Sequence, residues 1–106
     1  MSKGFGLIVR FTLKGEAAAT AFDALCVRTL QGIDALEPGT LAYVSHVPEG
    51  EPLVRVFYEL YADRAAFEAH EAQPHTRAFL AEREQYLDDV RVTFLQAVAG
   101  TAADRL

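Results

Sequence analysis

The chain has 106 residues, enough for one domain, and 51% of them are apolar, which suffices for a buried core. Ten basic residues against 15 acidic ones give a net charge of −5, and no stretch gathers basic side chains. This balance argues against a nucleic acid or an anionic membrane as partner, because both bind basic surfaces.

Cys26 is the only cysteine, so no disulfide can form within the chain. Its apolar neighbours at helical spacing predict an inert thiol in the core, and the lone cysteine fits a cytoplasmic location. The sequence predicts no signal peptide, since Met-Ser-Lys-Gly leads directly into a strand pattern. No apolar run approaches the roughly 20 residues of a membrane-spanning helix.

The first half of the chain predicts a strand, a helix and a hairpin. Residues 5–13 alternate between apolar and other positions, which is typical of a strand, and residues 16–36 have the apolar spacing of one helix face. Pro38 and Gly39 end that helix. Residues 40–47 and 53–62 are two further strands, joined by a turn that holds two prolines and a glycine.

The second half predicts two helices and a last strand. Asp63 is expected to cap a helix over 64–72, and Pro74 to begin another that runs to about Asp88. Residues 90–99 form the last strand and residues 100–106 a tail. The order βαββαβ predicts an α+β, ferredoxin-like fold: a four-stranded antiparallel sheet with the helices on one face. We expect one domain over residues 1–106, with its core at about 5–99.

The face of the sheet away from the helices is predicted to be apolar as well. Its apolar positions are Ile8, Val44, Val54, Val56, Tyr58, Leu60 and Leu95. A sheet face in water alternates to polar residues, so this face needs a cover. The short, polar C-terminal tail is the weaker candidate, and a second copy packed sheet to sheet is the better one.

The stretch from Glu37 to Gly100 resembles the antibiotic-biosynthesis monooxygenase family. Residues 37–43 (EPGTLAY) are similar to its helix-to-strand transition, residues 57–59 (FYE) to its third strand, and residues 63–70 and 74–79 to its helix pair. The resemblance implies a dimeric α+β barrel, with one pocket per subunit between sheet and helices. It also implies oxidation of quinols, anthrones or related aromatic, polyketide-type metabolites by O₂ without a metal.

Such chemistry needs a dry pocket, a base and a donor for a developing oxyanion. The candidate catalytic residues are His75, which begins a helix, His70, which ends the helix before it, and Tyr61. The candidate substrate-binding residues are Tyr43, Arg55, Tyr58, Arg77 and Phe79. Purely structural roles stay open for all of them. We expect no metal site, because His70 and His75 are five residues apart across a helix break, unlike a helical zinc pair.

The chain contains no Asn and no Trp, residue types that haem-degrading relatives and some monooxygenases of the family use, and Tyr61 stands where the tryptophan is expected. We therefore expect no haem. The family resemblance implies a reaction without a bound organic cofactor, and a reduced-flavin-dependent reaction is left open. Two other functions stay open: a non-oxidative isomerase or cyclase on the same barrel, and a non-catalytic protein that binds a phenolic or haem-like ligand. Turnover without O₂ indicates the former, and thermal stabilisation by a ligand without product indicates the latter.

Overall fold

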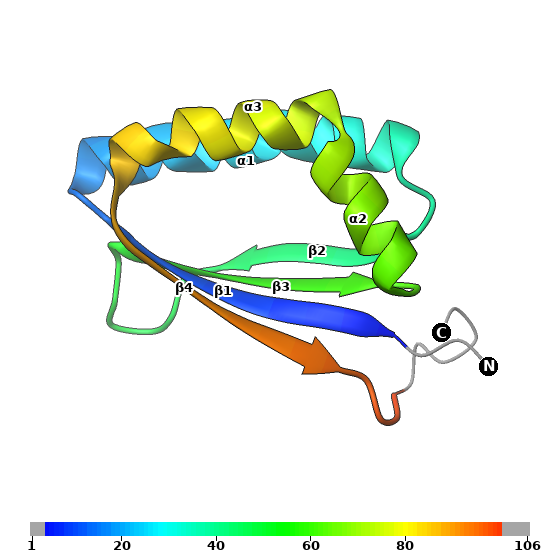
Figure 1. The fold of residues 1–106 in the computed structure, drawn as a ribbon. Coiled ribbons are helices and arrows are strands. Elements are labelled where there is room, and N and C mark those ends of the chain that lie inside the picture. The colour runs from blue at the N-terminus through cyan, green and yellow to red at the C-terminus, as the bar shows by residue number, and fades with distance from the viewer. Residues whose placement is uncertain (1–3, 101–106) are drawn as a thin grey trace.

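The computed structural model describes residues 4–100, and its elements follow the predicted βαββαβ order with the second helical section in pieces (Figure 1). In chain order they are β1 (Phe5–Leu13), α1 (Glu16–Leu36), β2 (Thr40–His46), β3 (Val54–Tyr61), α2 (Arg64–Ala72), α3 (Pro74–Glu82), a 3₁₀ turn η1 (Arg83–Tyr86) and β4 (Leu87–Gln96). As predicted, the Asp63 side chain accepts a hydrogen bond from the Ala66 amide at 2.8 Å and caps α2, and Pro74 opens α3.

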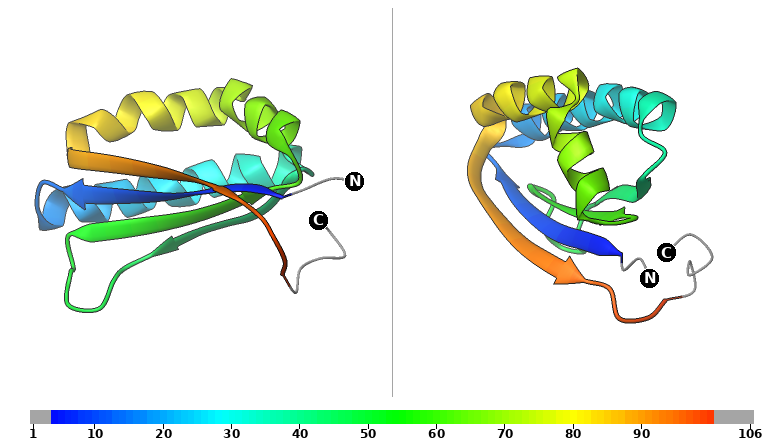
Figure 2. Two further views of the ribbon diagram at one scale, coloured as in Figure 1. Left: turned by 60° about the horizontal axis from the view of Figure 1, so that its bottom comes forward. Right: turned by 45° about the vertical axis from the view of Figure 1, so that its right-hand side comes forward.

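The strands form one antiparallel sheet in the order β2-β3-β1-β4, and the helices lie on one of its faces (Figures 1 and 2). Both crossovers therefore return to the same side of the sheet, which is the ferredoxin-like arrangement. The predicted fold class is confirmed. Within residues 4–100, no helix has the length and apolar character needed to cross a membrane.

The prediction for the end of the second helical section was wrong. The helix does not run to Asp88: α3 ends at Glu82, η1 follows, and β4 begins at Leu87 and ends at Gln96 rather than spanning 90–99. Strand pairing overrides the helical spacing here, because Leu87 already pairs with Leu13, and the Tyr86 carbonyl accepts from the Lys14 amide at 3.0 Å. The tighter 3₁₀ turn redirects the chain onto the sheet edge. The expected tail lies, from residue 101 onward, outside the described residues.

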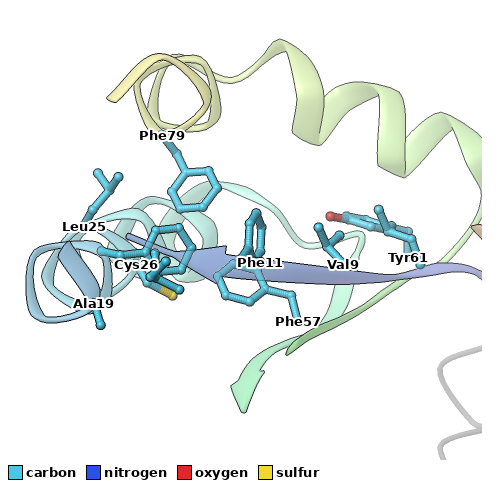
Figure 3. Packing of buried hydrophobic residues seen from close by; sticks show 11 residues of the cluster. Val9, Phe11, Ala19, Leu25, Cys26, Phe57, Tyr61 and Phe79 are labelled. Carbon is cyan, nitrogen blue, oxygen red and sulfur yellow. The ribbon is translucent and has the colours of Figure 1, made fainter. Parts of the chain in front are cut away.

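The core between sheet and helices is rich in aromatic rings (Figure 3). Phe11 of β1 packs edge-on against Phe57 of β3, with ring centroids 4.7 Å apart. Phe22 of α1 and Phe79 of α3 cover this pair from the helix layer, and their own ring centroids are 5.8 Å apart. Cys26 is buried beside them, as predicted, and burial raises the pKa of its thiol to about 11. The thiol therefore stays protonated and serves packing.

The helix layer leaves one edge of the sheet open. Val92 and Phe94 of β4 point to the helix side, yet 49% and 58% of their surfaces are exposed. The opposite side of the sheet, which we call the bare face, carries the apolar side chains expected from the sequence; among them Ile8 is 38% and Val44 45% exposed. The helices all lie on the other side (Figure 2). Residues 4–100 thus form one closed core and leave two apolar surfaces that no other described residue covers.

Candidate active site

A cavity of about 140 Å³ lies between the sheet and the helix layer. Most of its wall is apolar and comes from β1, β4, α2 and α3, with Phe11 and Phe79 at the side of the core and Val92 and Phe94 at the open β4 edge. Six polar side chains also line it: Tyr43, Glu59, His70, Glu71, Thr76 and Arg83. An apolar enclosure with a few converging polar groups is the usual form of a small-molecule site.

His70 is held in place by a buried carboxylate at the end of α1. Its Nδ1 lies 2.7 Å from Oε1 of Glu37, and both side chains are 3% exposed. The other oxygen of Glu37 pairs with Nε2 of His75 at the start of α3, and Thr40 donates to Oε1 at 2.7 Å. One carboxylate thereby fastens α2, α3 and β2 to the end of α1.

The ionisation of Glu37 fixes the tautomer of His70. Burial alone would raise the pKa of the Glu37 carboxyl group, but hydrogen bonds from Thr40 and the two histidines lower it below 4.5. Because a carboxylate only accepts, Nδ1 of His70 carries the proton, and in the neutral imidazole the lone pair is therefore on Nε2. No residue among 4–100 forms a hydrogen bond with Nε2, and His70 lines the cavity. This nitrogen is therefore available as a base to a bound molecule.

Glu59 is a second buried carboxyl group on the cavity wall. It is 6% exposed and accepts a hydrogen bond from the Tyr61 hydroxyl at 2.6 Å, its one hydrogen bond among the described residues. Burial raises the pKa of Glu59 to about 7, and the Tyr61 hydrogen bond opposes this rise only in part. Near neutral pH the group can both give and take a proton.

Arg83, in η1, brings a positive charge to the cavity without a settled partner. The Arg83 Nε is buried and has no hydrogen-bond partner within the described part of the chain. The nearest carboxylate oxygen belongs to Glu84 and lies 3.8 Å from Nε, and the Glu84 side chain is 71% exposed. The guanidinium carbon lies 5.6 Å from the centre of the Phe11 ring. A buried donor without an acceptor is costly, so an anionic oxygen of a ligand is its natural complement.

Tyr43 completes the set. Its ring lies 5.5 Å from the His70 ring, and its hydroxyl makes no hydrogen bond with any of residues 4–100. Burial raises the pKa of Tyr43 well above 10, so its hydroxyl stays a neutral donor. The cavity thus offers a base, an acid near neutrality, a cation and a neutral donor.

The structure brings some of the residues nominated from the sequence together and leaves others apart. His70, Tyr43 and Phe79 line the cavity. His75 and Tyr61 stand behind the wall, each hydrogen-bonded to a carboxyl group, and Figure 3 shows the Tyr61 hydroxyl pointing along the sheet toward Val9. The remaining three do not line it: Arg55 is paired with Asp23 through Nε at 2.8 Å, Tyr58 faces the bare face, and Arg77 is exposed on α3.

Glu37, Glu59 and Arg83 are not among the site residues nominated from the sequence. Glu37 was interpreted only as part of a helix end. A carboxylate at the C-terminal end of a helix is unfavourable beside the negative end of the helix dipole, which is a signal that it pairs with other groups. Glu59 occupies an inward position between Phe57 and Tyr61, and a charged residue in an otherwise apolar alternation is a similar signal.

Within residues 4–100, no three acidic, histidine or cysteine side chains are arranged to share a metal ion. The nitrogens of His70 and His75 are directed to separate oxygens of Glu37 rather than to a common point. Hydrogen bonds therefore hold His70 and Glu59 in position on the cavity wall.

The fold defines a small ferredoxin-like α+β protein with a cavity between sheet and helices. The family model for antibiotic biosynthesis monooxygenase matches residues 4–82, and the chain belongs to this family. No curated protein matches the chain.

Solved structures share the whole fold. PA3566 from Pseudomonas aeruginosa is 27% identical, with a TM-score of 0.79 over 93% of this chain and 98% of that one. A Caulobacter crescentus protein described as a candidate antibiotic biosynthesis monooxygenase is 23% identical, with a TM-score of 0.85 over 92% of both chains. SnoaB from Streptomyces nogalater, a cofactor-independent oxygenase solved as a point variant, is 18% identical, with a TM-score of 0.79 over 92% of this chain and 96% of that one. The last two show likeness of fold alone.

Proposed function

We propose that this protein is a monooxygenase that oxidises a small phenolic, quinol-like or polyketide-type aromatic molecule with O₂, without a metal or a bound organic cofactor. One observation carries the proposal: His70, whose Nδ1 is held by the Glu37 carboxylate, lines an apolar cavity that Arg83 also lines, and the Arg83 Nε has no hydrogen-bond partner among the described residues. Family membership and the description of SnoaB as cofactor-independent support it.

The first step is a proton transfer. Nε2 of His70 takes a proton from an acidic hydroxyl or C–H group of the substrate, and the Glu37 carboxylate stabilises the imidazolium that forms. The resulting anion places its oxygen near Arg83, whose charge acts strongly because the apolar wall excludes water. Deprotonation makes the aromatic system electron-rich enough to reduce O₂.

The second step uses that electron density. The anion passes one electron to O₂, and the superoxide and substrate radical combine to a peroxide on the substrate carbon. A proton from the imidazolium or from Glu59 makes it a hydroperoxide. Loss of the hydrogen on the same carbon and of the distal oxygen as water leaves a carbonyl group. One oxygen atom of O₂ enters the product and the other becomes water, with the substrate supplying both hydrogens.

The size of the cavity limits the substrate. Its volume of about 140 Å³ is below the roughly 300–1,000 Å³ of pockets that enclose drug-sized ligands. The reacting ring fits inside, and any larger part of the substrate extends past Val92 and Phe94 at the open β4 edge. A fused aromatic molecule with an acidic hydroxyl group matches this shape.

The proposal includes a homodimer formed through the bare face. Exposed apolar residues such as Ile8 and Val44 cover strands from the edge to the middle of that face. A second copy in the opposite orientation gives a closed, two-fold symmetric cover without any new sequence. The active-site cavity lies on the other side of each sheet, so each subunit keeps its own site.

The test is oxygen uptake with a panel of hydroquinones and anthrones, measured with and without reduced flavin. His70→Gln should lower the rate by about 100-fold or more, the contribution typical of a general base. His46→Gln, the same change at an exposed strand end, should leave the rate unaltered. Uptake no faster than the uncatalysed reaction, or equal rates for wild type and His70→Gln, would overturn the proposal.

A non-oxidative isomerase is the second candidate function. Glu59, with a pKa of about 7, and His70 would form the acid and base that such a reaction needs on the two sides of a bound ring. Product formation under strictly anaerobic conditions would favour this candidate over the monooxygenase.

A further inference from the structure

A second cavity lies on the far side of His70. It measures about 140 Å³ and sits between the end of α1, the start of β2 and α2. Among residues 4–100, His70 alone lines both this cavity and the substrate cavity, and Glu37 lines the second. At its rim are Leu36, which is 59% exposed, and Ala69, which is exposed on α2. The pair of His70 and Glu37 therefore forms a wall between the substrate cavity and a space that reaches the surface.

The lining of the second cavity suits water rather than an aromatic ligand. Apart from the His70 ring it holds no aromatic side chain, and its polar groups are the Glu37 carboxylate, the Thr40 hydroxyl and the Gln73 amide. A buried water needs two to four polar partners and about 30 Å³ of space. The second cavity provides both for a short chain of water molecules.

We propose that the second cavity is a proton port, through which the Glu37–His70 pair exchanges protons with solvent water while the substrate fills the substrate cavity. The purpose of the port rests on the proposed function, because a base in a dry cavity must exchange its proton without admitting bulk water to a reactive peroxide. The substrate cavity is lined at one edge by Val92 and Phe94 of β4, whereas β4 takes no part in the lining of the port among the described residues.

The proton balance is simple. His70 takes a proton at Nε2 from the substrate and loses one at Nδ1 to Oε1 of Glu37, 2.7 Å away. The carboxyl group passes that proton to a water molecule in the port, which leaves as H₃O⁺, and Glu37 becomes a carboxylate again. The reverse sequence returns one proton to Nδ1 when the Nε2 proton goes to the peroxide oxygen. No proton is gained or lost over a turnover.

His75 has a positioning role in this arrangement. It donates from Nε2 to the second oxygen of Glu37 and does not line either cavity. It therefore holds the carboxylate so that the first oxygen faces His70, and it is not a member of the proton route.

The experiment is NMR measurement of solvent exchange at the Nδ1–H proton of His70, which needs no substrate. In the wild type this proton should exchange rapidly although the side chain is 3% exposed. Ala69→Phe, which fills the port from its exposed rim, should slow exchange by about tenfold or more. Ala65→Phe is the matched control on the same helix, exposed and outside both cavities, and should exchange like the wild type.

A second variant, on a different helix, tests whether a local distortion of α2 rather than a blocked port explains slower exchange. Leu36→Trp closes the port from the end of α1 and should slow exchange as Ala69→Phe does, with the hydrogen-bonded Nδ1–H resonance retained as evidence of an intact Glu37 contact. Unchanged exchange in both variants would overturn the port. Oxygen uptake is a separate readout: a wild type that exchanges rapidly through the port but consumes no O₂ would overturn the proposed function and leave the port standing.

Discussion

Glu59 places a pH-sensitive charge in the core. Its pKa is about 7 in the folded protein against 4.5 for an ordinary glutamate, so the folded state binds more protons than the unfolded state between these values. The contribution of Glu59 to the free energy of unfolding therefore falls as pH rises from about 4.5 to about 7, and it is constant above that range. The residue is 6% exposed, so solvent screens this charge little.

Glu59→Gln removes the ionisation and keeps an acceptor for the Tyr61 hydroxyl. We expect this variant to exceed the wild type in unfolding free energy at pH 8 by at most roughly 3 kcal/mol, the linkage value of the pKa change. The two proteins should converge at about pH 4.5. Chemical denaturation across this pH range measures the effect, with the exposed Glu84→Gln as control. Parallel stability curves for wild type and Glu59→Gln would refute the assignment.

At the level of residues, the sequence could nominate His70, Tyr43 and Phe79 but could not show what orients them. The partner of His70 is Glu37, 33 positions away, and only the packing of α2 against the end of α1 brings the two together. Arg83 falls within the helix predicted from Pro74 to about Asp88, and the 3₁₀ turn that directs it to the cavity has no clear sequence signature.

At the level of elements, α1 and α3 are in close contact where Gly32 faces the His75 side chain. A methyl group added there would lie 2.5 Å from the Cγ and Nδ1 atoms of His75, so the glycine makes room for the ring that holds Glu37. The absence of a side chain at this position is thus a condition for the contact between the two helices and the Glu37 carboxylate.

Gly32→Ala would ordinarily stabilise a helix by about 1 kcal/mol. In this protein we expect it to destabilise by roughly 1–3 kcal/mol instead, because the methyl group must displace His75. In a His75→Ala background the clash is gone, and the same change should stabilise the protein. Denaturant unfolding of the wild type, the two single variants and the double variant gives the four unfolding free energies of a double-mutant cycle, which measures the coupling between Gly32 and His75. Equal effects in both backgrounds would show that Gly32 does not constrain His75.

The elements themselves were largely predictable, because their periodicities are clear and their ends carry strong signals, such as Asp63 before α2 and Pro74 at the start of α3. The prediction of the elements failed where helical spacing and strand pairing compete for the same residues. Residues 83–88 continue a helical spacing, yet the edge of β1 offers hydrogen bonds that the chain satisfies by forming β4 at Leu87. Local pattern cannot weigh a pairing with a strand more than 70 residues earlier.

At the level of the whole molecule, the bare face predicts the oligomeric state. The wild type should sediment at twice its chain mass of 11.6 kDa. Val44→Asp, at an exposed position of the bare face, should give monomers, since association would bury an unpaired carboxylate in each subunit. Val27→Asp, on the exposed side of α1, is the matched control and should stay dimeric. A monomeric wild type, or a dimeric Val44→Asp variant, would exclude the bare face as the interface.

In the proposed reaction, one atom of O₂ enters an aromatic substrate that is bound in the cavity beside His70, and no cofactor takes part. Turnover of a hydroquinone or anthrone by metal-free and flavin-free protein under ¹⁸O₂, followed by mass spectrometry, tests it most directly. We expect one labelled oxygen in the product, the other in water, and no product when O₂ is withheld. Product that forms without O₂, or that carries no label, would contradict the account.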